Sequence, residues 1–471
     1  MPLRHQPPTL RKASMTVIAS HFEKLCYDCP SQNKMIAMID SEEYLQFEGP
    51  FVHMPPQLLE DMLEEVKHVT HLRRHHLHVL LTPLLTNWSS HGIGDTHAAF
   101  RLLSNRCKLL GQIGMACPNL LELNLASTPI TDRGLVQLCI SEDGNRQCQN
   151  LLRLIVSDTA VTKAGATVVL QALPKLREFD YDHIFDVLQL VENWDETLEA
   201  RLLLGAGVRI SAETAPPPTR ICLTTLVSVA EHVPMEGLEA ATRLCPETRT
   251  VTLSNAWLPS EALYKLMVLD HLNSISLTNS EGLTLDFHEG VLPLLAVCGQ
   301  RLQNLILANF TSVDVSGIGQ ACPVLRNLAF SSIAQYEPIG RPCPEWFNHL
   351  KALELWSDPH ADLSPYMIRQ LLLFCPNMTN MLFKGCEVLN DKLMAEIWQE
   401  NPMPKLSHVT LDHCHKITGQ SLQRLLDAEN ELAVLRVWSC LNITKYLNLE
   451  LSHHIKNENL DVYFEWFEYD D

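Results

Sequence analysis

The stretch LLELNLASTPITDRGLVQL, residues 120–138, decides the fold of this chain. Its apolar signature, L-x-x-L-x-L, returns about every 23 to 31 residues through most of the 471-residue sequence. Weaker copies begin at Thr248 and Met378, and clear copies begin at Leu120, Leu151, Leu176, Leu272, Leu302, Leu325, Leu350, Leu406 and Leu432. A unit this short cannot bury its own apolar face and must stack on its neighbours. The sequence therefore predicts a solenoid.

Within this stretch, a strand is followed by a helix. Leu120, Leu123 and Leu125 have the spacing of strand residues that face a core. The apolar spacing then lengthens to a helical period at Leu135 and Leu138. A helix that returns the chain to the start of the next strand makes neighbouring strands parallel. The predicted class is therefore α/β, with parallel strands on the concave face of a horseshoe.

Cysteine and proline precede many of the repeats, as at Cys117-Pro118, Cys245-Pro246, Cys322-Pro323 and Cys375-Pro376. Cysteine is a small buried hydrophobe at the end of a helix, and proline stops the helix before the next strand. This pattern resembles the cysteine-containing leucine-rich repeats that are common in cytosolic ubiquitin-ligase receptors. Thr128 stands where the consensus asparagine of such a repeat would hydrogen-bond buried loop carbonyls. The resemblance covers roughly residues 80–450 and specifies the fold, not the function.

Composition limits the function classes. The hydrophobic content of 46% supports a sizeable core, and the formal charge of −19 would repel the phosphates of a nucleic acid. There is no run of about 18 apolar residues, and Met1 to Lys12 lacks the apolar core of a signal peptide. We therefore expect no nucleic-acid partner, no membrane insertion, a cytoplasmic or nuclear location, and 15 cysteines that are mostly reduced thiols.

The repeat pattern divides the sequence into regions. We expect a disordered tail at residues 1–8, a helical region at 9–78, leucine-rich repeats at 79–450, and a C-terminal cap with an acidic tail at 451–471. The period breaks between Leu176 and Thr248, where Ala215-Pro216-Pro217-Pro218-Thr219 interrupts it. An irregular insertion is therefore predicted near residues 183–245.

The first predicted helix carries one apolar stripe. Pro7-Pro8-Thr9 predicts its N-cap, and Leu10, Ser14, Ile18, Phe22 and Leu25 or Cys26 then fall on one stripe. This spacing resembles the elongin BC box, a small residue followed by Leu, Cys and an aliphatic residue, which implies that Leu10 and Ile18 insert into a groove of the adaptor. Ser14 stands in place of the cysteine, and burying its hydroxyl unpaired costs about 1–3 kcal/mol. The alternative is that the stripe packs on the end of the solenoid.

A second helix is predicted after a polar linker at residues 28–50. Its opening is similar to a cullin-2 box, in which an apolar residue and Pro are followed by two residues, an apolar residue, three residues and another apolar residue. Met54, Pro55, Leu58 and Met62 match this pattern. The same opening also looks like the start of an F-box. That pattern should continue with spaced Leu, Val and Trp, whereas residues 68–78 are rich in histidine.

The order of these boxes and the repeats resembles the zyg-eleven and zer-one family of cullin-2 substrate receptors, including the run His21-Phe22-Glu23-Lys24-Leu25-Cys26. Members of that family carry a long armadillo-like region after the repeats, which binds degrons with an N-terminal glycine. This sequence reaches Asp471 without such a region. The resemblance therefore implies elongin B/C and cullin-2 as partners but not recognition of glycine degrons.

The sequence gives little support for a metal site, a cofactor or catalysis. His68, His71, His75 and His78 would share one helix face, but solvated imidazoles explain the spacing without a metal. Cys26 and Cys29 form a C-x-x-C without a second pair at finger spacing. No nucleophile elbow, P-loop or spaced glycine fingerprint is present. We expect a noncatalytic protein without cofactor or metal.

Strand positions between the core leucines should face a bound protein. Glu178, Asp180 and Asp182 occupy such positions in an early repeat. Later repeats offer the residue types most often found as hot spots, and the predicted substrate-binding residues are Trp356, Lys384, Asp412, Arg436 and Trp438. The alternative is that the tail, with Tyr463, Phe464, Trp466 and Phe467, folds back over the two tryptophans as a cap.

These observations predict the substrate-recognition subunit of an elongin BC and cullin-2 ubiquitin ligase, which binds a protein target on its repeat surface. An F-box receptor and a scaffold that binds no cullin remain alternatives.

Overall fold

The computed structural model describes residues 10–22, 25, 53–69, 84–89, 108–193, 203, 205–208, 220–230, 232–280, 282, 284–338, 343, 345–357 and 363–467. The chain divides into an N-terminal unit, residues 8–228 and 234–248, and a C-terminal unit that takes in residues 229–233 and 249–471. The tail predicted at residues 1–8 lies outside the described residues, as do Cys26, Cys29, His71, His75 and His78.

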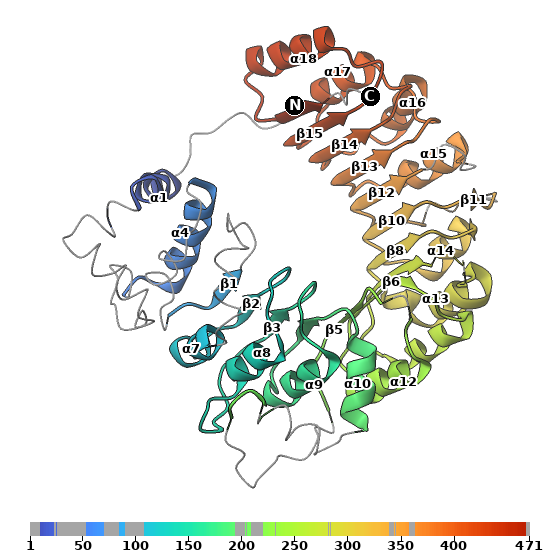
Figure 1. Ribbon diagram of the computed structural model, residues 1–471. Coiled ribbons are helices and arrows are strands. Elements are labelled where there is room, and N and C mark those ends of the chain that lie inside the picture. The colour runs from blue at the N-terminus through green and yellow to red at the C-terminus, as the bar shows by residue number, and fades with distance from the viewer. Residues whose placement is uncertain are drawn as a thin grey trace. The chain divides into compact units, whose positions relative to one another are not determined.

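The N-terminal unit begins with two helices and continues with strands and helices in alternation (Figure 1). Its strands pair in parallel and in sequence order: β1 (Asn87–Ser89), β2 (Glu122–Asn124), β3 (Arg153–Ile155), β4 (Glu178–Asp180) and β5 (Thr225–Ser228). The helices are α1 (Leu10–Ser20), α4 (Pro56–Val69), α7 (Lys108–Ala116), α8 (Asp132–Cys139), α9 (Lys163–Ala172), α10 (Ile184–Glu192) and α12 (Met235–Leu244).

The C-terminal unit continues the same plan, and its helices all lie on one side of its sheet (Figure 1). The strands pair in parallel in the order β6 (Thr250–Ala256), β7 (Ser274–Asn279), β8 (Asn304–Ala308), β10 (Asn327–Ser331), β12 (Ala352–Trp356), β13 (Asn380–Lys384), β14 (His408–Asp412), β15 (Val434–Trp438) and β16 (Tyr463–Phe467). A second parallel pair is formed by β9 (Ser312–Val313) and β11 (Gln335–Tyr336).

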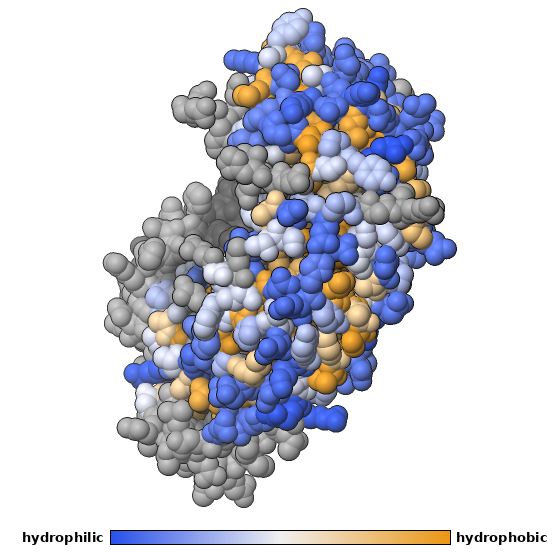
Figure 2. Space-filling view, turned by 90° about the vertical axis from the view of Figure 1, so that its right-hand side faces the viewer, coloured by the Kyte–Doolittle hydropathy of each residue, from blue (hydrophilic) through white to orange (hydrophobic). Residues whose placement is uncertain are grey.

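Helical segments connect these strands, and they lie on one side of the sheet (Figure 1). They are η2 (Ser260–Val268), η3 (Phe287–Val291), α13 (Leu292–Cys298), η4 (Gly299–Arg301), α14 (Val315–Ala321), α15 (Pro365–Leu373), α16 (Asp391–Glu400), α17 (Gly419–Asp427) and α18 (Lys445–Asn457). On the face drawn in Figure 2, apolar side chains are interspersed with hydrophilic ones. Of the helices that the structure describes, none is long and apolar enough to cross a bilayer.

The signature leucines form the core, as the sequence predicts. Leu302, Leu305 and Leu307 are fully buried, and the register pairs Leu305 with Leu328 and Leu307 with Phe330. From β7 to β16 each repeat therefore places its core residues directly against those of its neighbour, because these strands do not shift in register, whereas the β6–β7 pairing shifts between Ser254 and Ala256. The α/β leucine-rich-repeat fold predicted from the sequence is confirmed.

Hydrogen bonds from Thr and Cys side chains satisfy carbonyl groups near the ends of several strands. The hydroxyl of Thr128 is buried and donates to the carbonyl of Leu125 at 2.6 Å. In later repeats the thiols of Cys386, Cys414 and Cys440 donate to carbonyls of the preceding repeat, at 3.6, 3.5 and 3.6 Å. These three cysteines form a thiol ladder, in which each side chain links one repeat to the one before it.

A left-handed backbone position directly follows five strands, β8, β10, β13, β14 and β15. Asn309, Ser332, Gly385, His413 and Ser439 have φ of 62°, 50°, 66°, 51° and 49°. At each of these positions the backbone N–H donates to the last residue of the next strand; that of His413, for example, reaches the carbonyl of Trp438 at 3.0 Å. Glycine is needed at 385 for a second reason, because a Cβ there would clash with the Ser357 carbonyl oxygen.

The insertion predicted near residues 183–245 contains regular elements, since α10, β5 and α12 lie within it. The carboxylate of Glu192 on α10 receives two hydrogen bonds from Arg243 on α12, at 2.7 and 2.6 Å. Leu203, Ala206 and Val208 return to pack with Val136 and Val168 of α8 and α9. The described part of this region is therefore continuous with the repeats.

The C-terminal tail differs from the predicted cap. Residues 463–467 do not fold back over Trp356 and Trp438 but form β16, which pairs with β15 from Val434–Tyr463 to Trp438–Phe467. Phe464 and Trp466 occupy the two core positions of this strand and stay half-buried, and the Trp466 indole donates to the Ile443 carbonyl at 3.0 Å. The repeats thus extend beyond residue 450.

Candidate functional site

Helices α1 and α4 pack against each other. The buried side chains are Met15 and Ala19 of α1, Phe22 just after it, and Leu59, Met62 and Val66 of α4. They recur at intervals of three or four residues, which places them on one face of each helix. Arg11 forms an ion pair with Asp61, and the hydroxyl of Thr16 donates to Glu65 at 3.1 Å. The apolar contact is therefore flanked by polar links.

The predicted adaptor-binding stripe of α1 runs from the solvent-exposed side of the helix to the edge of the buried face. Leu10 is 84% exposed, Ser14 is exposed and Ile18 is half-buried. Val17 on α1 and Leu25 beyond it are also exposed. On a helical projection Leu10 and Val17 fall on the side away from Met15, Ala19 and Phe22, whereas Ile18 lies at the edge of the buried face, one turn before Phe22. The sequence thus supplies two apolar faces, of which one packs on α4 and the other is open to solvent.

The four predicted cullin-box residues do not share one environment. Pro55 is exposed and opens α4, and its carbonyl accepts from the backbone N–H groups of Leu58 and Leu59. Met54 and Leu58 are half-buried. Met62 is fully buried, so a partner cannot reach it while α1 and α4 are packed. Met62 thus packs toward α1, and the helix period alone does not tell which apolar stripe meets α1.

The predicted substrate-binding residues lie on what we call the strand face, the outward side chains of β12 to β16. Register pairs Trp356 with Lys384, Lys384 with Asp412, and Asp412 with Trp438. Arg436 lies in the neighbouring row, two residues before Trp438. The structure therefore brings the five predicted residues onto one surface, although they are up to 82 residues apart in sequence.

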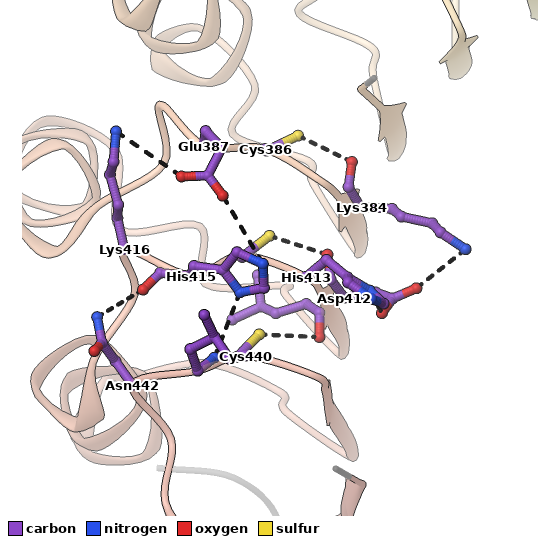
Figure 3. A network of polar contacts seen from close by, with 12 residues as sticks. Lys384, Cys386, Glu387, Asp412, His413, His415, Lys416, Cys440 and Asn442 are labelled. Atoms are coloured by element: carbon purple, nitrogen blue, oxygen red, sulfur yellow. Dashed lines mark hydrogen bonds and ion pairs between the residues drawn. The ribbon is translucent and has the colours of Figure 1, made fainter. Parts of the chain in front are cut away.

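Trp356, Lys384 and Asp412 are in contact. The Lys384 Nζ lies 5.3 Å from the centroid of the Trp356 ring and 3.3 Å from Asp412 Oδ2. The other oxygen of Asp412 is 2.6 Å from His413 Nδ1. Only 8% of Asp412 is exposed, whereas Trp356 is 43% exposed. Figure 3 shows Lys384 reaching toward Asp412 from the neighbouring strand.

Further polar contacts join the loops that follow β13, β14 and β15 (Figure 3). Glu387 lies 4.0 Å from His415 and 3.9 Å from Lys416, and the Asn442 amide donates to the His415 carbonyl at 2.6 Å. Burial raises the pKa of the Cys386 thiol to about 12 and that of Cys440 to about 11. Among the described residues, no three His, Cys, Asp or Glu side chains are arranged to hold a metal ion.

The strand face continues into β16, which sequence reasoning missed. Phe467 pairs in register with Trp438, and Glu465 accepts from Arg436 Nε at 3.1 Å. Tyr463 and Phe467 are exposed. The sequence does contain a pattern for this strand, because Phe464 and Trp466 repeat the last two apolar positions of L-x-x-L-x-L with aromatic residues in place of leucines. No sequence pattern indicated that His413 contacts Asp412, because this contact depends on the left-handed backbone conformation of His413.

Comparison with known proteins agrees with this architecture. A family model described as a leucine rich repeat matches residues 116–139, which include β2 and α8. The fold is a leucine-rich-repeat fold. No curated protein matches the chain by sequence.

Several solved structures resemble the chain at low identity. It is similar to a structure of the Rad7 and Elc1 complex in yeast, with 13% identity, coverage of 93% of this chain and 96% of that chain, and a TM-score of 0.49. It is also similar to an internalin, InlF, of Listeria monocytogenes (13%, 72% and 92%, TM-score 0.37). For TLR13 with ssRNA13 the values are 15%, 69% and 43%, with a TM-score of 0.40, so the chain spans less than half of that protein. These scores are below 0.5, and no function follows from them.

Proposed function

We propose that this chain is a noncatalytic substrate-recognition subunit of an elongin BC and cullin-2 ubiquitin ligase, active in the cytoplasm or nucleus. The single observation that carries the proposal is the open apolar face of α1, with Leu10 at 84% exposure. Leu10 and Val17, two helical turns apart on the exposed side of α1, form an apolar strip that fits the groove of a partner. Its spacing with Ser14 and Ile18 matches an elongin BC box, which supports elongin B/C as that partner.

The exposed Pro55 at the start of α4 supports cullin-2 as the second partner. Pro56, the first residue of α4, is preorganised for the first turn of the helix, and Met54 and Leu58 are half-buried on either side of Pro55 and Pro56. Because Met62 is buried, this contact would be limited to the beginning of α4. The strand face of the C-terminal unit would then hold the protein target, as leucine-rich repeats do with their extended surfaces.

Affinity purification of the full chain with elongin B/C and cullin-2 tests the proposal. Leu10→Asp should lower elongin recovery about tenfold or more, because a charge would enter an apolar groove. Pro55→Ala should lower cullin-2 recovery while elongins are retained. Ser14→Cys restores the residue of the family pattern and should tighten elongin binding.

Leu441→Asp is the matched control, because Leu441 is 75% exposed and lies in the C-terminal unit. It should leave both recoveries unchanged. An F-box receptor would keep its adaptor in the Leu10→Asp variant. Failure of the wild-type chain to recover elongins would contradict the proposal.

A further inference from the structure

The Lys384 ammonium occupies a site with the chemistry of a cation-binding pocket. The face of Trp356 lies on one side of it and the Asp412 carboxylate on the other, at 5.3 and 3.3 Å. An aromatic face and a carboxylate are the two groups that most directly attract an ammonium or guanidinium group. The chain thus fills this site with one of its own cations.

The site does not depend on Lys384 for its shape. Asp412 is held by its hydrogen bond to His413, and its backbone is paired with β13 and β15. Trp356 is paired with β13 through its strand. The Lys384 side chain is 47% exposed, so its long stem can rotate into solvent, and an incoming cation then restores the charge pairing of the buried Asp412. Another cation can therefore take its place.

The surrounding charges favour a basic ligand over an acidic one. Glu354 is exposed on the same face, two residues before Trp356, and among the described residues it has no cationic partner. Arg436 does not offer an unpaired charge to an acidic ligand, because it is paired with Glu465. The chain as a whole has a formal charge of −19, which attracts basic segments.

We propose that the strand face binds a basic segment of its target, and that an arginine or lysine of that segment replaces Lys384 between Trp356 and Asp412. The proposal rests on the proposed function in one respect, the use of the strand face to hold a target. Lys384 is then a competitor of the ligand and not one of its contacts. Glu354 supplies a second contact for a positive charge.

Fluorescence anisotropy with the full chain at physiological salt tests this idea. The probes are a fluorescein-labelled peptide of four Gly-Ser-Arg repeats and two otherwise identical peptides, with citrulline or glutamate in place of arginine. Removal of the competing cation in Lys384→Ala should tighten binding of the arginine peptide by about three- to tenfold. Trp356→Leu and Glu354→Gln should weaken it by a similar factor.

Two variants control for net charge. Lys392→Ala makes the same charge change as Lys384→Ala, on α16, where Lys392 is 88% exposed, and Glu458→Gln makes the same charge change as Glu354→Gln, just after α18. Neither should change the affinity by more than about twofold, because screening limits the effect of distant charges. Far-UV circular dichroism and thermal unfolding check that each variant remains folded.

The proposal is overturned if Lys384→Ala weakens binding of the arginine peptide or changes it no more than Lys392→Ala does. It is equally overturned if the arginine peptide does not bind, or if the glutamate peptide binds and loses affinity in Lys384→Ala. Elongin recovery is measured on the same variants. If the wild-type chain does not recover elongins, only the adaptor role is refuted, since the peptide assay contains no adaptor.

Discussion

Asp391 links two neighbouring repeats through its carboxylate. It is the first residue of α16, and it accepts hydrogen bonds from the backbone N–H and hydroxyl of Thr418 at 3.0 and 2.6 Å, and from the Ser421 hydroxyl at 2.6 Å. Asp132 bonds to Thr162 in the same way at 2.7 Å. Desolvation opposes ionisation of Asp391, but the hydrogen bonds from Ser421 and Thr418 outweigh it and lower its pKa.

A lowered carboxyl pKa makes stability depend on pH. The ionised Asp391 stabilises the fold fully above the pKa of an unfolded aspartate, about 3.9, and this contribution is lost as the pH falls through the lower folded value. Asp391→Asn should therefore reduce the free energy of unfolding by about 1–3 kcal/mol at pH 7. Urea unfolding measured between pH 7 and pH 3 should show the wild type and variant converging at the acidic end.

Asp270→Asn, a change of an exposed aspartate just after η2, is the control and should have no effect. A difference between wild type and Asp391→Asn that is the same at pH 7 and pH 3 would show that the carboxylate charge is not the cause.

At the scale of elements, α1 and α4 depend on each other. Met62 is fully buried in their contact, whereas Leu10 is almost fully exposed. Removing a buried methionine side chain costs about 2–5 kcal/mol. Met62→Ala should therefore accelerate amide exchange about tenfold or more within residues 10–22 and 56–69, as measured by hydrogen–deuterium exchange.

Leu10→Ala removes a side chain of similar size from the open face and should leave this exchange unchanged. Equal acceleration in both variants would mean that Leu10 is part of the internal packing, and the open face of α1 would then be lost as a docking surface.

At the scale of the whole molecule, burial separates the cysteines into reactive and unreactive thiols. The 12 described cysteines are free, and most are buried. Burial raises the pKa of Cys117, Cys322 and Cys386 to about 12. A thiolate is the reactive form, so these thiols should resist iodoacetamide at pH 8 while the exposed Cys222 reacts.

Peptide mass spectrometry of the native protein measures this difference, with urea-unfolded protein as the control in which all of these cysteines should be modified. Modification of Cys386 or Cys414 in the native protein at the rate of Cys222 would contradict the buried thiol ladder.

The repeat fold could be predicted because its signal is periodic. Each leucine of L-x-x-L-x-L has a fixed place relative to the next repeat, so aligning the copies also aligned Trp356, Lys384, Asp412 and Trp438. β16 was not predicted, because Phe464 and Trp466 replace the leucines. The burial of Met62 could not be read from a single helix, since two apolar stripes with the same period look alike until their partner is placed.

The unmatched outer edge of β16 has a consequence for how the C-terminal unit melts. Phe464 and Trp466 are half-buried, whereas the corresponding residues Leu435 and Val437 of β15 are fully buried. Among the described strands none pairs with the outer edge of β16, so fraying on heating should begin at β16 and proceed to β15. A ligand that binds to Tyr463 or Phe467 would then stabilise the last repeat and delay its unfolding.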